Sequence, residues 1–424
     1  MLTAIAGINW GDEGKGRMVD LLSETYDIVA RYQGGNNAGH TVVNDKGKFI
    51  LNLLPSGILR AGTVNVMGPG MVIDLEHLYK EMRSLTDKGI AITPENLKIS
   101  DRATICMPYH KLLDILEEDR LGAKKFGSTR RGIAPVYADK YMKKTLRMGD
   151  LKEPEAMKRR LTDIVEWKNL IVHDGYKHEA LSVDELYDWL MQYGAPVSDY
   201  ICDTTVYLTQ QAAAGKNIMF EAQLGALRDI DFGIYPYTSS SSTLAAYAPI
   251  GAGIPNLKLG NTIGIMKAYS SCVGEGPFVC EFFGEEAHQL REAGGEYGAA
   301  TGRPRRVGPF DVVASRYGTL LQGADCIALT KLDVLSGMEK IPVCTAYEID
   351  SQRTMDFPSG ERHLRAKPVV EYLEGFSGDI SGCRKLSDLP LAAQKYVEYI
   401  QNSVGCPIRY ISVGAAREEY IDVL

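Results

Sequence analysis

Two carboxylates lie inside a sequence that otherwise follows the pattern of a phosphate-binding loop. Residues 7–22 read GINWGDEGKGRMVDLL, whereas the usual pattern is G-x-x-x-x-G-K-[ST]. The leading glycine stands two places too far upstream, and Gly16 replaces the hydroxyl residue that normally holds Mg²⁺. Lys15 supplies the expected positive charge, but Asp12 and Glu13 add negative charge. A carboxylate beside phosphates is unfavourable unless it binds a metal ion or acts as a base. We therefore predict both roles for Asp12.

A second glycine-rich segment, RYQGGNNAGHTVV at residues 31–43, carries a single histidine. A lone histidine is more often structural than catalytic. His40, however, follows small residues and stands between Asn37 and Thr41, in a loop that comes after one apolar run and before another. This setting favours an acid or a phosphate ligand.

Two basic segments, KKFGSTRRGIAP at 124–135 and GAATGRPRRVG at 298–308, combine arginines with Gly and Thr. Guanidinium groups match planar oxyanions in geometry, so such loops suit phosphate or carboxylate recognition. A solvated positive surface is the alternative for either segment alone. Both occur in a chain of net charge -7, which favours ligand binding over a general basic face.

The segment LTKLDVLSG at 329–337 contains a T-K-x-D element of the kind that recognises guanine. The carboxylate of Asp333 can accept hydrogen bonds from guanine N1–H and from the 2-amino group together, which adenine cannot supply. A four-residue pattern often matches by chance. This one follows an apolar strand, in a chain that has a nucleotide-binding loop elsewhere, which favours guanine recognition.

Alternating apolar and amphipathic segments must position these residues. Strands are predicted at 2–9, 26–33, 63–68, 217–223, 325–335 and 407–414, and helices at 75–89 and 153–170. This alternation predicts an α/β fold, a single domain over 1–424 with one large, mostly parallel twisted sheet flanked by helices. Ligands bind such sheets where loops leave the strand carboxyl ends, so the loops at 33–41, 122–147, 224–243, 270–276 and 294–308 are expected to form one composite site.

Composition excludes several classes of protein. The 424 residues are 45% hydrophobic and 24% charged, as in ordinary globular proteins, and the net charge of -7 argues against a nucleic-acid binder. Eight scattered cysteines include no C-x-x-C pair, which favours free thiols over zinc or disulfide frameworks. The first residues lack the pattern of a signal peptide, and no apolar run reaches the length of a membrane span. We therefore expect a cytoplasmic protein with no membrane partner.

Five segments, in order, resemble the adenylosuccinate synthetase family: WGDEGKG (10–16), RYQGGNNAGHT (31–41), IYPYTSSSST (234–243), GRPRRVG (302–308) and TKLDVL (330–335). The similarity extends over essentially the whole chain. It implies condensation of IMP with L-aspartate, driven by GTP and one Mg²⁺ per subunit, to give adenylosuccinate, GDP and phosphate. It also implies a homodimer with a P-loop-like GTP site, long active-site loops and smaller helical subregions.

The resemblance also implies roles for individual residues. Asp12 takes the N1 proton of IMP, His40 acts as an acid on the transferring phosphoryl group, and Lys15 completes the catalytic set, while Asp12 and the Gly39 carbonyl ligate Mg²⁺. The residues implied for GTP are Gly11, Asp12, Glu13, Gly14, Lys15, Gly16, Arg17, Gly39, His40, Thr41, Arg305, Lys331, Leu332, Asp333, Ser412, Val413 and Gly414. Those implied for IMP are Asp12, Glu13, Gly14, Lys15, Asn37, Ala38, Gly39, His40, Thr129, Lys143, Gln223, Leu224, Ser239 and Arg303. Those implied for L-aspartate are Ala299, Ala300, Thr301, Gly302, Arg303, Pro304 and Arg305.

Several positions depart from the family pattern. Lys143 replaces an Arg that reaches across the dimer to the IMP phosphate, and Leu224 replaces a Gln that contacts IMP, with Gln223 one place earlier. Ala300 replaces a Thr, Pro304 interrupts the arginine run and Ala415 replaces a Pro. These changes leave open a variant synthetase that acts on another 6-oxopurine nucleotide.

A regulatory GTPase is the less favoured alternative. Such a switch needs a Ser or Thr at the position of Gly16, and its D-x-x-G element appears only as DRLG at 119–122. That stretch is better interpreted as the end of an amphipathic helix with a glycine cap.

Overall fold

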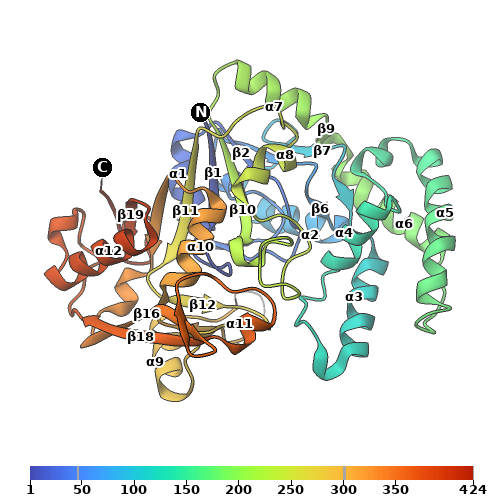
Figure 1. Cartoon of the computed structure of the whole chain (residues 1–424). Coiled ribbons are helices and arrows are strands. Elements are labelled where there is room, and N and C mark those ends of the chain that lie inside the picture. The colour runs from blue at the N-terminus through green and yellow to red at the C-terminus, as the bar shows by residue number, and fades with distance from the viewer. Residues whose placement is uncertain (45–46, 299–301, 424) are drawn as a thin grey trace.

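A ten-stranded sheet forms the centre of the molecule (Figure 1). The computed structural model describes residues 1–44, 47–298 and 302–423. Neighbouring strands are parallel throughout this sheet except at the β19–β20 edge, which is antiparallel. In spatial order the strands are β20 (Tyr420–Asp422), β19 (Ile408–Ser412), β15 (Cys326–Thr330), β11 (Asn261–Lys267), β1 (Leu2–Gly7), β10 (Ile218–Gly225), β2 (Ile28–Arg31), β5 (Val64–Met67), β7 (Leu97–Ser100) and β9 (Ile201–Cys202).

The central strands are apolar on both faces because both faces are covered. Successive residues of a strand point to opposite faces, yet Ala4, Ile5 and Ala6 of β1 are all fully buried. Ile5 packs in a cluster with Met18 and Val19 of α1 (Lys15–Leu22). Ala4 and Ala6 pack in another cluster with α7 (Thr204–Ala213) and α8 (Ala248–Ala252). The α/β fold class predicted from the sequence is therefore confirmed.

A strand forms in each of the six predicted ranges, but the prediction for 325–335 is too long, because β15 ends at Thr330 and Leu332–Leu335 form a 3-10 turn. The strand that lies between two of the predicted ones was not expected. β11 pairs with β1 on one side and with β15 on the other. Its sequence, NTIGIMK, contains Gly264, which weakens a strand pattern. The glycine is needed because a Cβ there would come within 2.6 Å of Ile8 Cδ1 and 2.8 Å of Ile327 Cδ1.

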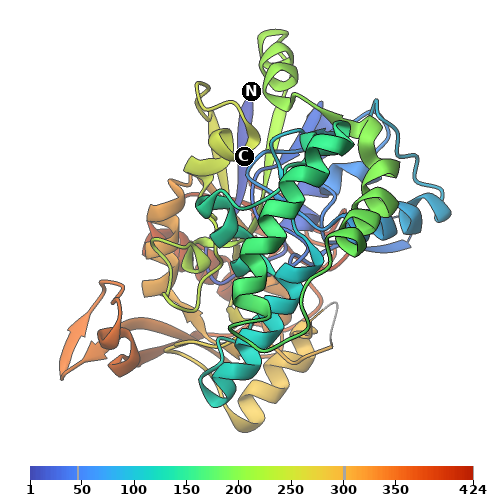
Figure 2. The ribbon, with the colours of Figure 1, turned by 90° about the vertical axis from the view of Figure 1, so that its right-hand side faces the viewer.

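A helical subregion lies beside the end of the sheet that carries β7 and β9 and faces the viewer in Figure 2. The predicted helices at 75–89 and 153–170 form within a residue or two of their expected ends. The helices of this part are α2 (Leu75–Asp87), α3 (Pro108–Leu121), α4 (Ile133–Met142), α5 (Pro154–Val172) and α6 (Val183–Gly194).

The expectation that residues 122–147 form one loop is wrong, because α4 lies within them. Gly132 has a left-handed φ of 78° at the start of α4, and the helix then buries Val136 and Tyr137. The Tyr137 hydroxyl donates to the Gly70 carbonyl at 2.8 Å, a contact that no local pattern reveals. The DRLG segment ends α3 and Gly122 caps it, as the sequence indicated.

A smaller sheet projects from the other side of the molecule and is visible at the lower left of Figure 2. It consists of β14 (Phe310–Asp311), β16 (Lys340–Ile349), β17 (Gln352–Thr354) and β18 (Lys367–Glu374). The remaining strands form pairs: β3 (His40–Asn44) with β4 (Gly47–Leu51), β6 (Val72–Ile73) with β8 (Thr104–Ile105), and β12 (Ser270–Cys272) with β13 (Arg306–Gly308). The remaining helices are α9 (Gly284–Gly294), α10 (Val312–Gln322), α11 (Glu361–Arg365) and α12 (Leu391–Val404).

β12 and β13 fall within two of the predicted loops, so the loops at 270–276 and 294–308 are shorter than expected. All eight cysteines lie in the described ranges and are free thiols. Within those ranges we find no helix with the length and apolar character needed to cross a bilayer.

Candidate active site

The loop between β1 and α1 has the backbone geometry of an anion-binding turn. Gly11, Asp12 and Gly14 have φ values of 104°, 59° and 99°. Turns of this kind direct successive N–H groups to one side, and the start of α1 adds the positive end of its dipole. The Asp12 side chain is about one-third exposed, at 34%, so it can reach a ligand.

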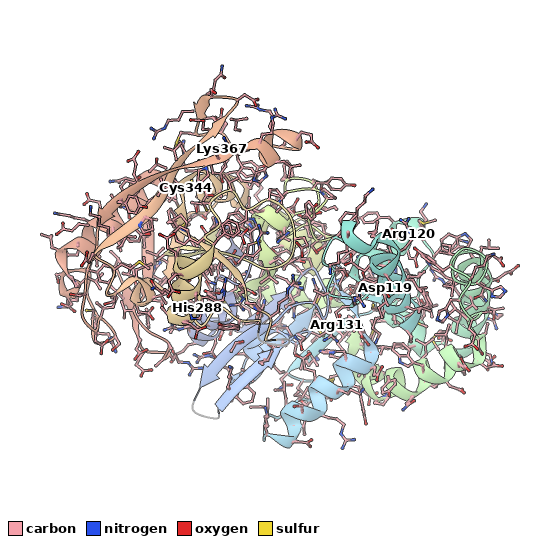
Figure 3. The ribbon with its side chains drawn as sticks, turned by 90° about the horizontal axis from the view of Figure 1, so that it is seen from below. Asp119, Arg120, Arg131, His288, Cys344 and Lys367 are labelled. Atoms are coloured by element: carbon pink, nitrogen blue, oxygen red, sulfur yellow. The ribbon has the colours of Figure 1, made fainter. Side chains whose placement is uncertain are left out.

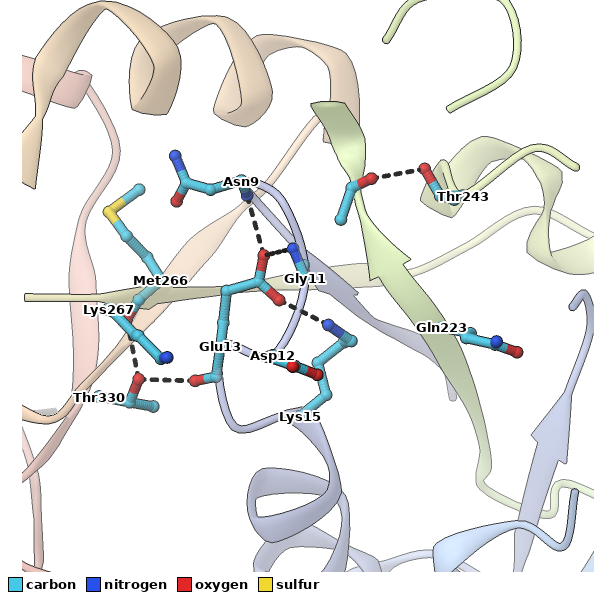
Figure 4. A network of polar contacts seen from close by, with 12 residues as sticks. Asn9, Gly11, Asp12, Glu13, Lys15, Gln223, Thr243, Met266, Lys267 and Thr330 are labelled. Carbon is cyan, nitrogen blue, oxygen red and sulfur yellow. Dashed lines mark hydrogen bonds and ion pairs between the residues drawn. The ribbon is translucent and has the colours of Figure 1, made fainter. Parts of the chain in front are cut away.

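The second carboxylate of the loop, Glu13, points inward (Figure 4). It accepts hydrogen bonds from the backbone N–H groups of Asn9, at 3.1 Å, and Gly11, at 2.8 Å, and it pairs with Lys15 Nζ at 2.5 Å. The Glu13 side chain therefore closes the loop on itself. Only its backbone is left for the GTP and IMP contacts that the sequence analysis predicted.

The absence of a hydroxyl residue after Lys15 has a steric cause. A Cβ on Gly16 would lie 2.9 Å from the Cβ of His40, closer than real Cβ atoms approach. Gly16 thus lets the second glycine-rich segment pack directly against the start of α1. This contact places His40 next to the phosphate-binding loop.

A buried carboxylate orients His40. The Nδ1 atom lies 2.5 Å from Glu221 Oε1, and Glu221 also accepts from the backbone N–H of Ser56 at 2.7 Å and its hydroxyl at 2.6 Å. Burial alone would raise the pKa of Glu221, but His40, Arg31 and Ser56 outweigh it and hold that pKa below its usual value. The ring therefore presents Nε2 to the opposite side. Glu221 was not predicted as a site residue, although an acidic residue inside the apolar strand NIMFEAQ is a usable signal.

The predicted guanine element follows β15. Lys331 has a left-handed φ of 64°, and the hydroxyl of Thr330 donates to the Glu13 carbonyl at 2.6 Å, which ties this element to the phosphate-binding loop. Asp333 Oδ1 is buried with no hydrogen-bond partner among the described residues. Burial raises the pKa of Asp333 despite the opposing charges of Lys331 and Arg17. A buried carboxylate oxygen without a partner is costly and suits a ligand that donates to it.

Arg17 joins the C-terminal segment to the same place. Its Nη1 atom donates to Ser412 Oγ and to the Gly414 carbonyl, each at 2.5 Å. Leu332 and Val413 are buried beside these contacts. The structure therefore brings together the predicted GTP residues of three distant segments.

The basic segment at 298–308 reaches Asp12 through Arg305. Arg305 Nη2 lies 3.1 Å from Asp12 Oδ2, and Nη1 lies 2.8 Å from Glu296 Oε2. Arg303 is more exposed and pairs with Glu275 at 3.3 Å. Gly302 and Pro304 lie in the described part of the loop, whereas Ala299, Ala300 and Thr301 lie outside the described residues.

The predicted IMP residues are less uniformly placed. Ser239 Oγ is buried without a partner among the described residues, as expected of a ligand position. Ala38 is buried, Gly39 is half-buried, and a Cβ added to Gly39 would meet no atom within 4 Å among the described residues. Gln223 and Leu224 differ in direction: the Gln223 amide is buried, whereas Leu224, with φ of 63°, has its Cα 3.2 Å from where a Gly11 Cβ would lie.

The other basic segment, at 124–135, is largely exposed to solvent. Thr129 is exposed, and Lys143 is exposed at the C-terminal end of α4, where its side chain makes no hydrogen bond or ion pair within the described ranges. Figure 3 shows Arg131 of this segment together with Asp119 and Arg120 near the end of α3. Neither Thr129 nor Lys143 is joined by a hydrogen bond to the other predicted residues in the described part of this single chain.

Comparison with known proteins accounts for this arrangement. The family model for adenylosuccinate synthetase matches residues 4–421.

The chain belongs to the adenylosuccinate synthetase family.

An adenylosuccinate synthetase of Caldanaerobacter subterraneus is 44% identical over 99% of this chain and 98% of its own length. A protein named adenylosuccinate synthetase 2 in Pseudoalteromonas translucida is 45% identical over 98% of each chain.

Two solved structures are similar to this member of the family. The fully ligated adenylosuccinate synthetase of Plasmodium falciparum superposes with a TM-score of 0.93 at 35% identity, over 99% of both chains. The succinoaminodeoxyadenylate synthetase of cyanophage S-2L, bound to dGMP and dATP, gives a TM-score of 0.61 at 18% identity, over 99% of this chain and 95% of that one. The second likeness shows a shared fold alone.

A further residue of the site that was not predicted from the sequence is Glu296. It is fully buried and accepts from Lys267 Nζ at 2.7 Å, from the Tyr269 hydroxyl and from Arg305. Burial alone would raise its pKa, but Lys267 and Arg305 lower the pKa of Glu296 to about 2. Glu296 thereby holds Arg305 in front of Asp12.

This lowered pKa predicts a pH-dependent contribution to stability. The pKa falls from 4.5 to about 2 on folding, so the stabilisation is complete above pH 4.5 and is lost as the pH falls toward 2. Glu296→Gln should lower the free energy of unfolding by about 3 kcal/mol at pH 7, and the difference from the unmodified protein should shrink below pH 4.5. Urea unfolding between pH 7 and pH 3 measures both. The exposed Glu286, on the preceding helix α9, provides the control variant Glu286→Gln. A difference that does not change with pH would contradict this account.

Proposed function

We propose that this chain condenses IMP with L-aspartate at the expense of GTP, giving adenylosuccinate, GDP and phosphate. The observation that carries the proposal is the position of Asp12. A partly exposed carboxylate stands in the middle of a phosphate-binding turn, next to a histidine that a second carboxylate orients. A base and a phosphoryl-transfer site at one place are what activation of a 6-oxopurine requires.

In the first step, Asp12 accepts the N1 proton of IMP. The electron pair released from the N1–H bond moves onto O6, which attacks the γ-phosphorus of GTP and displaces GDP. This transfer needs in-line placement and neutralisation of charge more than covalent help. His40, held through Nδ1 by Glu221, acts as the acid and donates from Nε2 to the phosphoryl group. Lys15 adds positive charge at the start of α1.

In the second step, the amine of L-aspartate attacks C6 of the 6-phosphoryl intermediate. The C6–O6 bond breaks and phosphate leaves with O6, while the neutral amine gives one proton to the departing phosphate and keeps the other as N6–H. Arg305 is placed to hold the incoming aspartate beside Asp12, because its guanidinium already lies 3.1 Å from that carboxylate. We assign Gly302, Arg303, Pro304 and the undescribed Ala299, Ala300 and Thr301 to the same loop.

The residues around Asp12 suit Mg²⁺. This ion takes oxygen ligands and keeps several waters or phosphate oxygens, so it needs few protein groups. The partly exposed Asp12 carboxylate supplies one such oxygen, and we assign the carbonyl of the half-buried Gly39 as a second. When bound there, Mg²⁺ would neutralise charge on the phosphates.

The nucleotide contacts follow from the same geometry. We assign guanine to Lys331, Leu332 and Asp333 with Ser412, Val413 and Gly414, and the GTP phosphates to the backbone of residues 11–17 and 39–41. We assign IMP to Asp12, Asn37, Ser239 and the loop that contains Thr129, with Arg303 at the edge shared with aspartate. The buried oxygens of Asp333 and Ser239, which have no hydrogen-bond partner in the described part of the chain, support these assignments.

The two alternative functions predict different substrates. A regulatory GTPase would hydrolyse GTP without IMP, and its D-x-x-G element would need to be a loop, whereas DRLG here ends α3. A variant synthetase would prefer another 6-oxopurine nucleotide, such as a guanylate. The proteins named above at 44% and 45% identity favour IMP.

The decisive assay follows the change in purine absorbance with IMP, GTP, L-aspartate and Mg²⁺, omitting each in turn and replacing IMP with GMP or dGMP. We expect no product when any component is missing, and little product with GMP or dGMP. Product with GMP or dGMP in preference to IMP would establish the variant, and GTP hydrolysis that needs neither IMP nor aspartate would establish the switch.

We propose further that the chain acts in the cytoplasm as one domain over 1–424 and forms a homodimer in which Lys143 reaches the IMP phosphate of the neighbouring subunit. Its exposure at the end of α4 leaves it available for that contact. IMP should then strengthen dimerisation by mass action. Lys143→Leu should raise the KM for IMP at least about tenfold and leave that for GTP unchanged.

Sedimentation at rising IMP concentration, with initial rates, tests this linkage. The neighbouring Lys144→Leu is the matched control, because Lys144 packs over the Trp167 ring instead. If IMP has no effect on association and the mutant keeps its KM, Lys143 lies outside the site.

A further inference from the structure

The amide of Gln223 connects a buried arginine to the candidate IMP residue Asn37. Gln223 lies on β10, where Figure 4 shows its side chain, and it is buried. Its Oε1 atom accepts from Arg31 Nη2 at 2.7 Å, and its Nε2 atom donates to Asn37 Oδ1 at 2.5 Å. Its backbone carbonyl also accepts from Gln33 Nε2 at 2.7 Å.

Arg31 decides which way this amide faces. A guanidinium group has donors and no acceptor, so the atom of Gln223 that meets it must be the oxygen. Arg31 is itself fully buried and anchored at 2.5 Å to the carbonyl of Asn52. The amide nitrogen of Gln223 is thereby directed at Asn37.

The same logic decides the orientation of Asn37. Its Oδ1 atom accepts from Gln223 Nε2 and from the backbone N–H of Gly35, at 3.2 Å. The Asn37 Nδ2 group must then face the other way, and it meets no acceptor within the described ranges. Two donors converge on the oxygen, so a reversed Asn37 amide would bring donor against donor.

The backbone is shaped to admit Gln223. A Cβ at residue 34 would lie 1.9 Å from Gln223 Oε1, so only Gly34, with φ of 76°, fits there. Leu224 has a left-handed φ as well, which turns the two successive side chains in different directions. These features hold the Gln223 amide in a single place.

We propose that Gln223 is a positioning residue for IMP: it fixes the Asn37 amide with Nδ2 presented to an acceptor oxygen of the bound nucleotide. This inference rests on the proposed function, in which Asn37 contacts IMP. It gives a role to one of the departures from the family pattern, since the glutamine acts through Asn37 from position 223 and leaves Leu224 to pack over Gly11.

A double-mutant cycle tests the relay. The KM for IMP is measured at saturating GTP and aspartate for the unmodified enzyme, Asn37→Ala, Gln223→Ala and the double variant. We expect each single variant to raise this KM about tenfold, which corresponds to roughly one hydrogen bond, while the KM for GTP stays within about twofold. The double variant should resemble Asn37→Ala alone. Asn65→Ala, which removes another buried amide, should lower the melting temperature without changing the KM for IMP.

Gln223→Glu keeps the volume and the acceptor for Arg31 but removes the donor to Asn37. The Asn37 amide should then reverse to donate to the carboxylate and present its oxygen to the nucleotide. We therefore expect a larger rise in KM for IMP than in Gln223→Ala, with only a small fall in the melting temperature, because the reversed amide loses the bond from the Gly35 N–H. This variant remains informative if Gln223→Ala does not fold.

Three results would overturn the inference. If the effects of Asn37→Ala and Gln223→Ala multiply to about 100-fold, Gln223 acts independently of Asn37. If Asn37→Ala raises the KM and neither Gln223 variant does, the positioning role alone fails. An unchanged KM for IMP in Asn37→Ala removes Asn37 from the proposed IMP site, and the inference falls with that assignment.

Discussion

Replacing Asp12 with Asn should lower kcat by more than about 10⁴-fold while the protein stays folded. Loss of a general base alone typically costs about 10²- to 10⁴-fold, and Asp12 is also proposed to bind Mg²⁺. The fold should tolerate the change because Asn is isosteric and accepts the left-handed φ of 59° at this position. The ion pair with Arg305 is lost, but Glu296 still holds that guanidinium.

The chain offers a closely matched control in Asp350. It too has a left-handed φ, of 52°, and its carboxylate lies 3.1 Å from an arginine, Arg365. Asp350→Asn should therefore repeat the backbone and charge change without touching the site. Steady-state rates and thermal unfolding of both variants are the measurement. A kcat within tenfold of the unmodified enzyme in Asp12→Asn would remove Asp12 from the role of base.

Replacing Asp333 with Asn should change which nucleotide triphosphate the enzyme uses. Guanine offers two adjacent donors to a carboxylate, whereas adenine turns an acceptor toward it. Because Asp333 Oδ1 is buried and has no partner among the residues that the structure describes, ATP would leave two acceptors facing each other in a desolvated pocket. The unmodified enzyme should prefer GTP over ATP by at least about 10³-fold in kcat/KM. Asn exchanges one acceptor for a donor, so the variant should lose about 10²-fold with GTP and gain with XTP, whose 2-oxo group accepts.

Rates with GTP, XTP and ATP at fixed IMP and aspartate decide this point. Asp325 lies just before β15, at its other end from Asp333, and accepts from the Thr262 N–H, so Asp325→Asn should leave the base preference as it was. Efficient use of ATP by the unmodified enzyme, or a retained preference for GTP in Asp333→Asn, would show that Asp333 does not recognise the base.

The parts of the fold that could be predicted are those that local sequence determines. β1, β15 and β19 are short apolar runs buried on both faces, and the segments that follow them keep their motifs within a few residues. The residues placed around the phosphate-binding loop, including Asp12, His40 and Asp333, could therefore be named from spacing alone. Their convergence followed from the rule that ligands bind at the carboxyl ends of parallel strands.

The parts that could not be predicted depend on contacts between distant segments. Glu13 is the exception, because it is held inward by its near neighbours Asn9, Gly11 and Lys15, but only once the loop has closed. Glu221 and Glu296 have no motif, and their roles depend on partners far along the chain.

Two further features also depend on residues that are distant in the sequence. In β11, residue 264 is a glycine because Ile8 and Ile327 leave no room for a side chain there. The direction of the Gln223 amide is decided by Arg31, 192 residues away in the chain.

The most direct test of the proposed reaction follows the oxygen at C6 of the purine. IMP labelled with ¹⁸O at position 6 is turned over with GTP, L-aspartate and Mg²⁺, and the inorganic phosphate is analysed by mass spectrometry. If O6 is phosphorylated and then displaced by the aspartate amine, each molecule of adenylosuccinate is accompanied by one phosphate that carries a single ¹⁸O atom. Unlabelled phosphate, with the label retained in the purine or lost to water, would contradict the 6-phosphoryl intermediate and with it the role of Asp12.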